Sequence, residues 1–228
     1  MSRRAADNAI ASARVSINGH IASIGETIDP ETDDIRLDGE PLYQSRKYYL
    51  AVYKPKYMIT TMKDPEGRAC INDLIPEKYK GVFPVGRLDF DAEGLLILTN
   101  DGDMANAIHH PTHNLGKVYI VDLRPEASAA ALRKMSKGVE IDGIVTREAL
   151  VERIQDVKGM TTVRITLKQG LKNQIKRMAE AVGLNVVSIK RIAIGPISLG
   201  KMRPREIREL GDPEVRALLN MQKKQKLA

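Results

Sequence analysis

The segment from Gly86 to Gly102, GRLDFDAEGLLILTNDG, constrains the fold more than any other part of the chain. A turn with carboxylates at three positions runs directly into Leu95–Thr99, which is almost wholly apolar. A short apolar run bounded by turn residues is typical of a strand buried in a sheet. Loops that a rigid sheet holds in place commonly carry catalytic groups. We therefore expect a buried strand here, with candidate functional residues in the turn before it.

The carboxylates of this turn are Asp89, Asp91 and Glu93, and they allow several interpretations. They could supply a nucleophile, a general acid and base, or the ligands of a metal ion. They could instead be structural, pairing with nearby arginines or capping backbone amides. Local chemistry by itself favours the structural interpretation.

The rest of the chain mixes helices and strands without regular alternation. Stretches rich in β-branched and aromatic residues predict strands over 48–53, 118–123, 162–167 and 186–192. Helical spacing and end signals predict helices over 2–12, 126–137, 173–182 and from Asp212 to about Leu219. Because helices and strands do not alternate, the pattern argues against a doubly wound parallel sheet. We predict an α+β fold with a largely antiparallel sheet flanked by helices.

Charge is distributed unevenly along the chain, whose net charge is +7. Residues 1–44 carry four basic and eight acidic side chains, a net of −4, which leaves +11 for residues 45–228. Within the latter, residues 168–208 hold ten Lys or Arg against two Glu. Such an excess favours a polyanionic partner, because phosphate contacts release counterions. A solvated basic face without a ligand explains the charge equally well.

The acidic bias ends near Pro41, which also breaks regular structure. We therefore predict a small N-terminal module over 1–44, a main domain over 45–220 and a basic tail over 221–228. The single cysteine excludes a disulfide framework. No apolar stretch reaches the roughly 18 residues of a membrane span, and the chain start lacks the apolar core of a signal peptide. We expect a monomeric, soluble, cytoplasmic protein that binds no membrane.

Three histidines, His109, His110 and His113, lie within five positions and could in principle hold zinc. No cysteine or clearly placed acidic ligand accompanies them. We therefore interpret this stretch as a loop at the rim of a binding surface, and predict no metal site.

Several segments of the main domain fall in the order of a known set of motifs. These segments are Lys54-Pro55, Asp64–Arg68 with Asp73–Pro76, Gly86–Gly102, Lys117–Val121 and Gln169–Met178. Together they resemble the motifs of the bacterial ribosomal RNA pseudouridine synthases typified by RsuA. The Gln169-Gly170-Leu171 form resembles the large-subunit member RluF. The resemblance covers residues 45 to about 211.

The resemblance implies a catalytic site. In that family the Asp of the Gly-Arg-Leu-Asp motif is the nucleophile, a role that falls here to Asp89. The reaction breaks the bond from uracil N1 to ribose C1′ and joins C5 to C1′, so nothing enters or leaves and no cofactor is required. The resemblance also implies Lys176 as the cationic partner of Asp89, and Tyr119 as the ring that packs on the target base. Without the motifs, Lys176 reads as an exposed helical lysine and Tyr119 as a half-buried strand residue.

The same resemblance implies contacts with RNA. Arg87 would fill the space that an extruded uridine leaves, unless it forms a surface ion pair with Asp91 or Glu93. The other residues assigned to this role are Lys54, Lys172, Arg177 and, as an apolar pocket wall or as core packing, Ile192.

Residues 1–44 resemble part of an S4 RNA-binding module, in which Arg3 and Arg4 would contact RNA. Ser2–Ala6 and Ala13–Gly19 match its second helix and the following strand, whereas residues for its first helix are missing. Asn173 also departs from the family pattern, which has a basic residue or histidine at this position.

Three functions compete at this point. The first is an enzyme that isomerises a uridine in ribosomal RNA, in the large subunit if the Gln-Gly-Leu form is a guide. The second is a protein of the same fold that binds RNA or assists ribosome assembly without chemistry. The third is a glycosidase with paired carboxylates, which gains nothing from a basic surface. The first two have ribosomal RNA or a pre-ribosomal particle as the partner.

Overall fold

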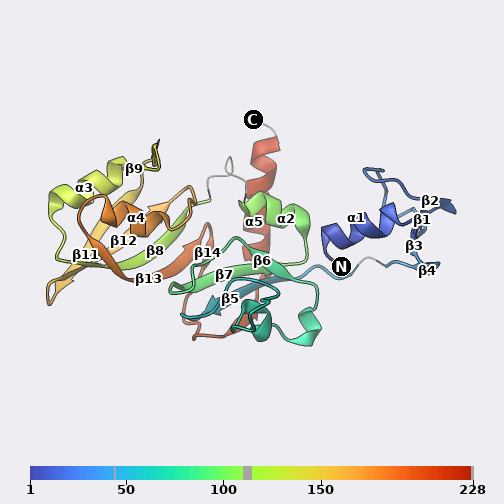
Figure 1. Ribbon diagram of the computed structural model, residues 1–228, viewed down its shortest axis with the longest axis horizontal. Coiled ribbons are helices and arrows are strands. Elements are labelled where there is room, and N and C mark those ends of the chain that lie inside the picture. Colours follow the sequence, from blue (N-terminus) through green and yellow to red (C-terminus); the bar gives the residue numbers. More distant parts are fainter. Residues whose placement is uncertain (44, 110–114, 227–228) are drawn as a thin grey trace. The chain divides into compact units, whose positions relative to one another are not determined.

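The computed structural model describes residues 1–43, 45–109 and 115–226. The chain divides into two compact units, Met1–Lys47 and Tyr48–Ala228 (Figure 1). Among the described residues, no helix is long and apolar enough to cross a membrane.

The first unit consists of one helix and a small antiparallel sheet in the order β2-β1-β3-β4. Its elements are α1 (Arg3–Ala11), β1 (Val15–Ile17), β2 (His20–Ile21), β3 (Ile35–Leu37) and β4 (Glu40–Pro41). The Ser2 hydroxyl accepts a hydrogen bond from the Ala5 amide at 3.2 Å and so caps the start of α1. Asn18 and Gly19 have φ of 50° and 88°, which is the left-handed geometry of a tight hairpin turn.

The second unit is built on a nine-stranded sheet. Its strands are β5 (Tyr49–Lys54), β6 (Phe83–Val85), β7 (Glu93–Thr99), β8 (Lys117–Arg124), β11 (Leu150–Val157), β12 (Met160–Leu167), β13 (Asn185–Ile194), β14 (Ile197–Ser198) and β15 (Ile207–Glu209). Its main path runs β11-β12-β8-β13-β7-β5-β15, with β14 paired to β13 and β6 to β7. Every pairing is antiparallel except β13 with β7. The α+β fold with a largely antiparallel sheet is confirmed.

Helices and short elements complete this unit. They are α2 (Gly102–His109), α3 (Ala129–Lys137), α4 (Gln174–Glu180), α5 (Asp212–Lys226), 3₁₀ turns at Ile71–Leu74 and Glu77–Tyr79, and the hairpin of β9 (Glu140–Ile141) and β10 (Ile144–Val145). The predicted C-terminal helix is longer than expected, because α5 continues through residues assigned to a basic tail. Those residues include Gln and Lys, which are good helix formers.

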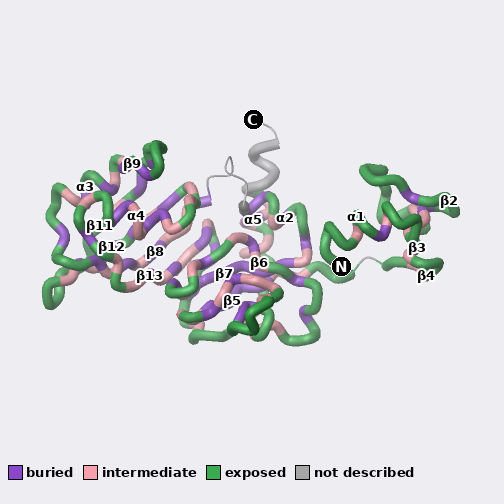
Figure 2. The backbone as a smooth tube through the Cα atoms, in the orientation of Figure 1, coloured by how far each residue is buried: buried purple, intermediate pink, exposed green. Residues whose placement is uncertain are grey.

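Strands β5 and β7 are buried on both faces (Figure 2). On one face, Ala51 and Leu95 belong to a cluster that also contains Met104 of α2 and Leu218 of α5. On the other face, alternate residues of the same strands pack against the segment 58–82. The apolar run of β7 is therefore explained, because neither face of this strand meets water.

Strands β8 and β12 alternate between buried and partly exposed residues. Their inward side chains, such as Val121 and Ile165, form one cluster with Met135 of α3 and Met178 of α4. One face of this part of the sheet is thus covered by two helices. The period of two in the sequence corresponds to this single covered face.

The sheet has two parts, β11-β12-β8-β13 and β7-β5-β15, which meet where β13 pairs with β7. Gly94 allows these two parts to join. The parallel pairing of β13 with β7 places Arg191 opposite Gly94. A Cβ built at Gly94, whose φ is +113°, would lie 2.2 Å from the Arg191 carbonyl oxygen. Only glycine fits so close an approach at this backbone angle.

Several elements were not predicted from the sequence, and the longest of them are α2 and β11. Helix α2 begins after Asp101, whose Oδ1 accepts hydrogen bonds from the amides of Asp103 and Met104 at 3.1 and 3.3 Å. Strand β11 is exposed over most of its length. A strand at a sheet edge with little buried surface has no strong apolar alternation, so its sequence carried no clear signal.

Candidate active site

A cleft of about 840 Å³ opens in the second unit. It is lined by residues of the loop between β6 and β7, of β8, of β13 and of the segment 167–175 that leads into α4. Asp89, Arg87, Tyr119 and Lys172 are among these residues, so the fold brings together four residues that the sequence pointed to.

The loop that carries Asp89 is held from below by the segment 54–60. The contacts are Lys54 Nζ to Ala92 O at 2.8 Å, the Tyr57 amide to Phe90 O at 2.6 Å, and Thr60 Oγ1 to Leu88 O at 2.8 Å. Every second carbonyl of the loop is therefore fixed. Asp89 lies between two anchored residues and is half-buried, whereas Arg87 and Asp91 are exposed. The backbone thus positions Asp89 firmly at the cleft.

Lys54 has a structural position rather than the predicted place on an RNA-binding surface. It is fully buried, and its Nζ also donates to Pro55 O and Met58 O, both at 2.9 Å. Burial lowers the pKa of Lys54 to about 8, while the charges of Asp89 and Asp91 act in the opposite direction. With no exposed surface, Lys54 cannot reach RNA, and its assignment as an RNA contact is wrong.

Asp89 has Asn173 as its polar neighbour. With the amide oriented to satisfy its surroundings, Asn173 Nδ2 donates to Asp89 Oδ2 at 3.1 Å and to Oδ1 at 3.3 Å. Asn173 has φ 52° and ψ 30°, a left-handed conformation that asparagine tolerates. It makes no side-chain cap bond to α4, so its amide is free for this contact. Asn173, the residue that departs from the motif of the resembled family, therefore contacts the candidate nucleophile Asp89.

Lys176 is paired with Asp91 and not with Asp89. Its Nζ lies 2.7 Å from each carboxylate oxygen of Asp91. Burial raises the pKa of Asp91, but the hydrogen bond and charge of Lys176 outweigh this effect and leave the pKa below its usual range. The predicted direct pairing of Lys176 with Asp89 is not observed. Instead, Lys176 of α4 forms an ion pair with Asp91, which lies on the same loop two residues after Asp89.

Tyr119 and Arg191 lie together at the cleft. The Arg191 guanidinium carbon is 6.0 Å from the centre of the Tyr119 ring. Arg191 is only 2% exposed; its Nε donates to Leu95 O at 2.7 Å and its Nη1 to Arg87 O at 3.2 Å. Its Nη2 is buried and has no partner among the described residues. Sequence reasoning missed Arg191, although Ile189 and Arg191 share one strand face by the period of two.

The cleft is strongly electropositive. Its charged lining comprises one carboxylate, Asp89, and the cations Arg87, Lys117, Arg147, Lys168, Lys172 and Arg191. Burial lowers the pKa of Lys117, and the charge of Arg191 lowers it further. An anionic ligand is therefore favoured over a neutral one.

The remaining predicted residues fall inside and outside the cleft. Arg87 lines the cleft. It does not form the alternative ion pair with Asp91 or Glu93. Asp91 binds Lys176, and Glu93 accepts a hydrogen bond from the Tyr53 hydroxyl at 2.7 Å.

Two predicted contacts lie elsewhere. Arg177 forms an ion pair with Asp142 and does not line the cleft. Ile192 does not line it either; Ile189 and Ile194 of the same strand do. The pocket wall assigned to Ile192 is therefore supplied by its neighbours.

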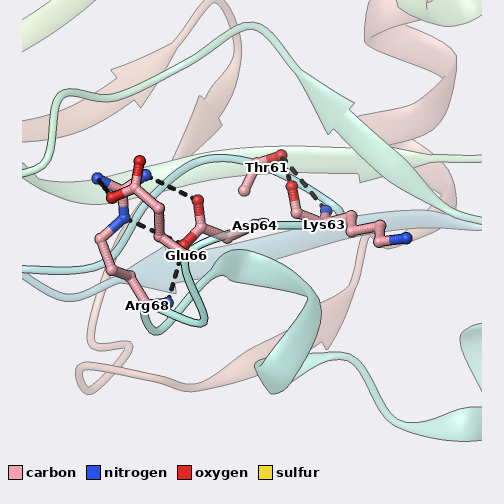
Figure 3. A network of polar contacts seen from close by, with 5 residues as sticks. All are labelled: Thr61, Lys63, Asp64, Glu66 and Arg68. Carbon is pink, nitrogen blue, oxygen red and sulfur yellow. Dashed lines mark hydrogen bonds and ion pairs between the residues drawn. The ribbon is translucent and has the colours of Figure 1, made fainter.

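The motif segment Asp64–Arg68 forms a polar network of its own (Figure 3). Arg68 donates to both oxygens of Asp64, at 2.8 and 3.1 Å, and pairs with Glu66 at 2.8 Å. Thr61 Oγ1 donates to Lys63 O at 2.9 Å in the same loop. None of these residues lines the cleft, and their contacts hold the loop together.

No group of three metal-ligating side chains occurs within residues 1–43, 45–109 and 115–226. His110 and His113 lie outside the described residues, as does the side chain of His109, so the prediction for this stretch stays a prediction.

Comparison with known proteins gives the family. Residues 48–181 match the family model for RNA pseudouridylate synthase. An RNA pseudouridine synthase of Aquifex aeolicus is 42% identical over 221 residues, which cover 95% of this chain and 88% of that protein. Ribosomal large subunit pseudouridine synthase B of Bacillus subtilis is 31% identical over 219 residues, covering 95% and 90% of the two chains.

A solved structure agrees with these relatives. The crystal structure of a pseudouridylate synthase superposes with a TM-score of 0.72 and 29% identity, over 96% of this chain and 94% of that one. These comparisons confirm the resemblance to RNA pseudouridine synthases at the level of the family. The chain belongs to the RNA pseudouridylate synthase family of isomerases.

Proposed function

We propose that the protein isomerises a uridine of ribosomal RNA to pseudouridine, with Asp89 as the catalytic nucleophile. The observation that carries the proposal is that Asp89 is the one carboxylate among the described residues that line the electropositive cleft. Tyr119 lines the same cleft, where its ring can pack on a base. The loop beneath Asp89 is fixed through its backbone, so the nucleophile is held in place before substrate arrives.

The chemistry requires little beyond these residues. The bond from uracil N1 to ribose C1′ breaks, the base turns, and C5 bonds to C1′. A proton leaves C5 and one is taken up at N1, so the product has the atoms of the substrate and no redox partner is involved. Asp89 holds the electron-deficient sugar or the base during the exchange.

Ribosomal RNA is the substrate suggested by the name of one relative and by the motifs of the sequence. The Bacillus relative is named for the large ribosomal subunit, and the Gln169-Gly170-Leu171 form agrees with that choice. Exposed cations at the cleft, Arg87, Lys168 and Lys172, suit the phosphates that flank a target nucleotide.

We further propose that residues 1–44 act as a partial S4-like RNA-binding module. Arg14 pairs with Asp38 and Arg36 with Asp34, so these two cations are neutralised locally. Arg3 and Arg4 are exposed on α1, which leaves them available for phosphate contacts. The overall acidity of this unit limits such contacts to the end of α1 that carries these arginines.

The test is tritium release from under-modified ribosomal RNA labelled at uridine C5. The intact protein should release tritium, and Asp89→Asn should lower the rate by at least about 100-fold. Asp122→Asn is the matched control, because Asp122 is also half-buried but does not line the cleft. Absence of release by the intact protein on both subunit RNAs would overturn the proposed substrate. Equal rates for Asp89→Asn and the intact protein would overturn the role of Asp89.

A further inference from the structure

Arg191 carries a buried positive charge that no described carboxylate neutralises. Its guanidinium is held by the carbonyl oxygens of Leu95 and Arg87, and Nη2 is left without a partner. The neighbouring Lys117 adds a second cation at the same cleft. Neither residue forms an ion pair among the parts of the chain that the structure describes.

Such an arrangement is costly for folding. A buried charge without a counterion loses its hydration and gains little in return. The guanidinium group of arginine stays charged in proteins, so the cost is not relieved by becoming neutral. An unpaired donor on a buried arginine that lines a cleft therefore indicates a ligand that brings an acceptor to it.

The depth of Arg191 decides which part of an RNA can reach it. The cations Arg87, Lys168 and Lys172 are exposed and accessible to backbone phosphates. Arg191 is 2% exposed and lies beside the Tyr119 ring. A nucleotide that is turned out of the RNA inserts its base most deeply. A donor at this depth is therefore suited to the oxygens of an inserted base, O2 or O4 of uracil, rather than to backbone phosphates.

Resting on the proposed function, we propose that Arg191 and Lys117 form a subsite that stabilises uracil as an anion while it is detached from the ribose. When the bond from N1 to C1′ breaks, the electron pair stays on N1 and spreads to O2 and O4. The Arg191 Nη2 donates to one of these oxygens as its charge grows. The deficient sugar is held through Asp89 until C5 forms the new bond and loses its proton.

The subsite acts at a different place from Asp89. Asp89 acts as the nucleophile, whereas Arg191 and Lys117 stabilise the negative charge of the departing base. The assignment is therefore independent of which atom Asp89 attacks. It also gives a reason to keep a buried cation without a counterion, since a fixed donor that meets charge only during reaction lowers the barrier.

The experiment compares two leaving groups in one RNA. Single-turnover loss of the target nucleoside is measured by mass spectrometry of nuclease digests, with uridine or 5-fluorouridine at the target. Fluorine withdraws electrons and makes the uracil anion more stable, so this base needs less help to depart. Arg191→Gln should slow the loss of uridine roughly 100- to 1,000-fold. The factor by which it slows the loss of 5-fluorouridine should be about 10 times smaller.

Variants and outcomes are arranged to separate binding from chemistry. The ratio of the two rates within one variant does not depend on the folded fraction, and Arg191→Lys and Lys117→Gln provide further variants should Arg191→Gln fold poorly. In all three variants, the loss of 5-fluorouridine should be slowed less than the loss of uridine. Lys172→Gln is the control: as an exposed cation that meets phosphate, it should slow both substrates equally.

Equal defects of the Arg191 and Lys117 variants on the two bases would overturn the subsite and indicate a phosphate contact or a packing role. Failure of the intact protein to convert uridine at all would count against the proposed function instead. The two failures are therefore distinguishable.

Discussion

The amide of Asn173 lies against the carboxylate of Asp89, with Nδ2 3.1 Å from Oδ2 and 3.3 Å from Oδ1. The candidate nucleophile is thus held by a neutral donor, while the nearby lysine of α4 binds Asp91. This arrangement makes Asn173 a positioning residue for Asp89.

Asn173→Asp should shift the pH dependence of activity. The substitution keeps the shape of the side chain but places a second carboxylate within about 3 Å of Asp89, and like charges raise the apparent pKa of such a pair. Activity should fall at neutral pH and recover as the pH rises. Asn173→Gly keeps the left-handed backbone and removes the amide, so it should lower activity without moving the profile. Identical pH profiles for the Asp and Gly variants would refute the contact.

The pair formed by Lys176 and Asp91 should contribute little to stability. The Asp91 side chain is 53% exposed, so we expect a coupling of about 0.5 kcal/mol in a double-mutant cycle of Lys176→Met and Asp91→Asn. The lowered pKa of Asp91 means that the contribution is present above the ordinary carboxyl pKa and is lost as the pH falls through the lower folded value. Urea unfolding at neutral and acidic pH measures the coupling. A coupling that persists at low pH would show that charge is not its source.

Lys54 should titrate far below other lysines. Its pKa is about 8 in the folded protein, against about 10.4 for an unfolded chain. Between these values the unfolded chain binds more protons, so the contribution of Lys54 to the free energy of unfolding increases as the pH rises from about 8 to about 10. The ¹³Cε shift of labelled lysine should report the midpoint.

Lys54→Met should remove that pH dependence and cost about 3 kcal/mol or more, because two buried carbonyls and one partly buried carbonyl lose their donor. A lysine signal that titrates normally, together with a mild effect of the substitution, would contradict the buried position.

Gly94→Ala should be among the most damaging single-methyl changes in the chain. The new Cβ would meet the Arg191 carbonyl oxygen at 2.2 Å and its nitrogen at 2.7 Å, both of them backbone atoms that cannot turn aside. We expect a loss of about 3 kcal/mol or more in the free energy of unfolding. Gly102→Ala is the control, since nothing lies within 4 Å of its Cβ position. Thermal unfolding compares the two, and similar melting temperatures would be inconsistent with the observed join.

The exposed cations of the cleft should determine the salt dependence of RNA binding. Arg87→Gln should weaken binding of ribosomal RNA fragments and reduce the slope of log affinity against log salt by about 1. Arg177→Gln should leave the slope unchanged, because Arg177 is paired with Asp142 and lies outside the cleft lining. A reduced slope for Arg177→Gln would instead support its predicted contact with RNA.

The sequence predicted those parts of the molecule that depend on local pattern. The turn before β7 and the alternation of β8 could be read directly, because burial on one or both faces leaves a regular trace in neighbouring residues. The alternation places Tyr119 on a strand, whereas its place at the cleft was implied by the family resemblance. These features need no knowledge of what lies across the sheet.

The parts that failed depend on partners distant in sequence. Lys54 reads as a surface lysine, yet it is enclosed by carbonyls from two segments, one of them 38 residues away. Lys176 matches a motif, but which carboxylate it meets depends on the loop opposite α4. Arg191 shares a strand face with Ile189, but this pattern does not reveal what holds its guanidinium, because the carbonyl partners belong to β7 and the loop before it. Such contacts join residues distant in the sequence, so they can be identified only from the three-dimensional structure.

The meeting of β7 and β13 at Gly94 also bears on the order of events during refolding. Asp89 precedes β7, whereas Tyr119 belongs to β8, on the far side of β13. Neither portion of the sheet alone contains both residues, so activity through the proposed site requires both portions to be folded and docked. Recovery of enzymatic turnover after dilution from denaturant should therefore lag behind the return of secondary structure.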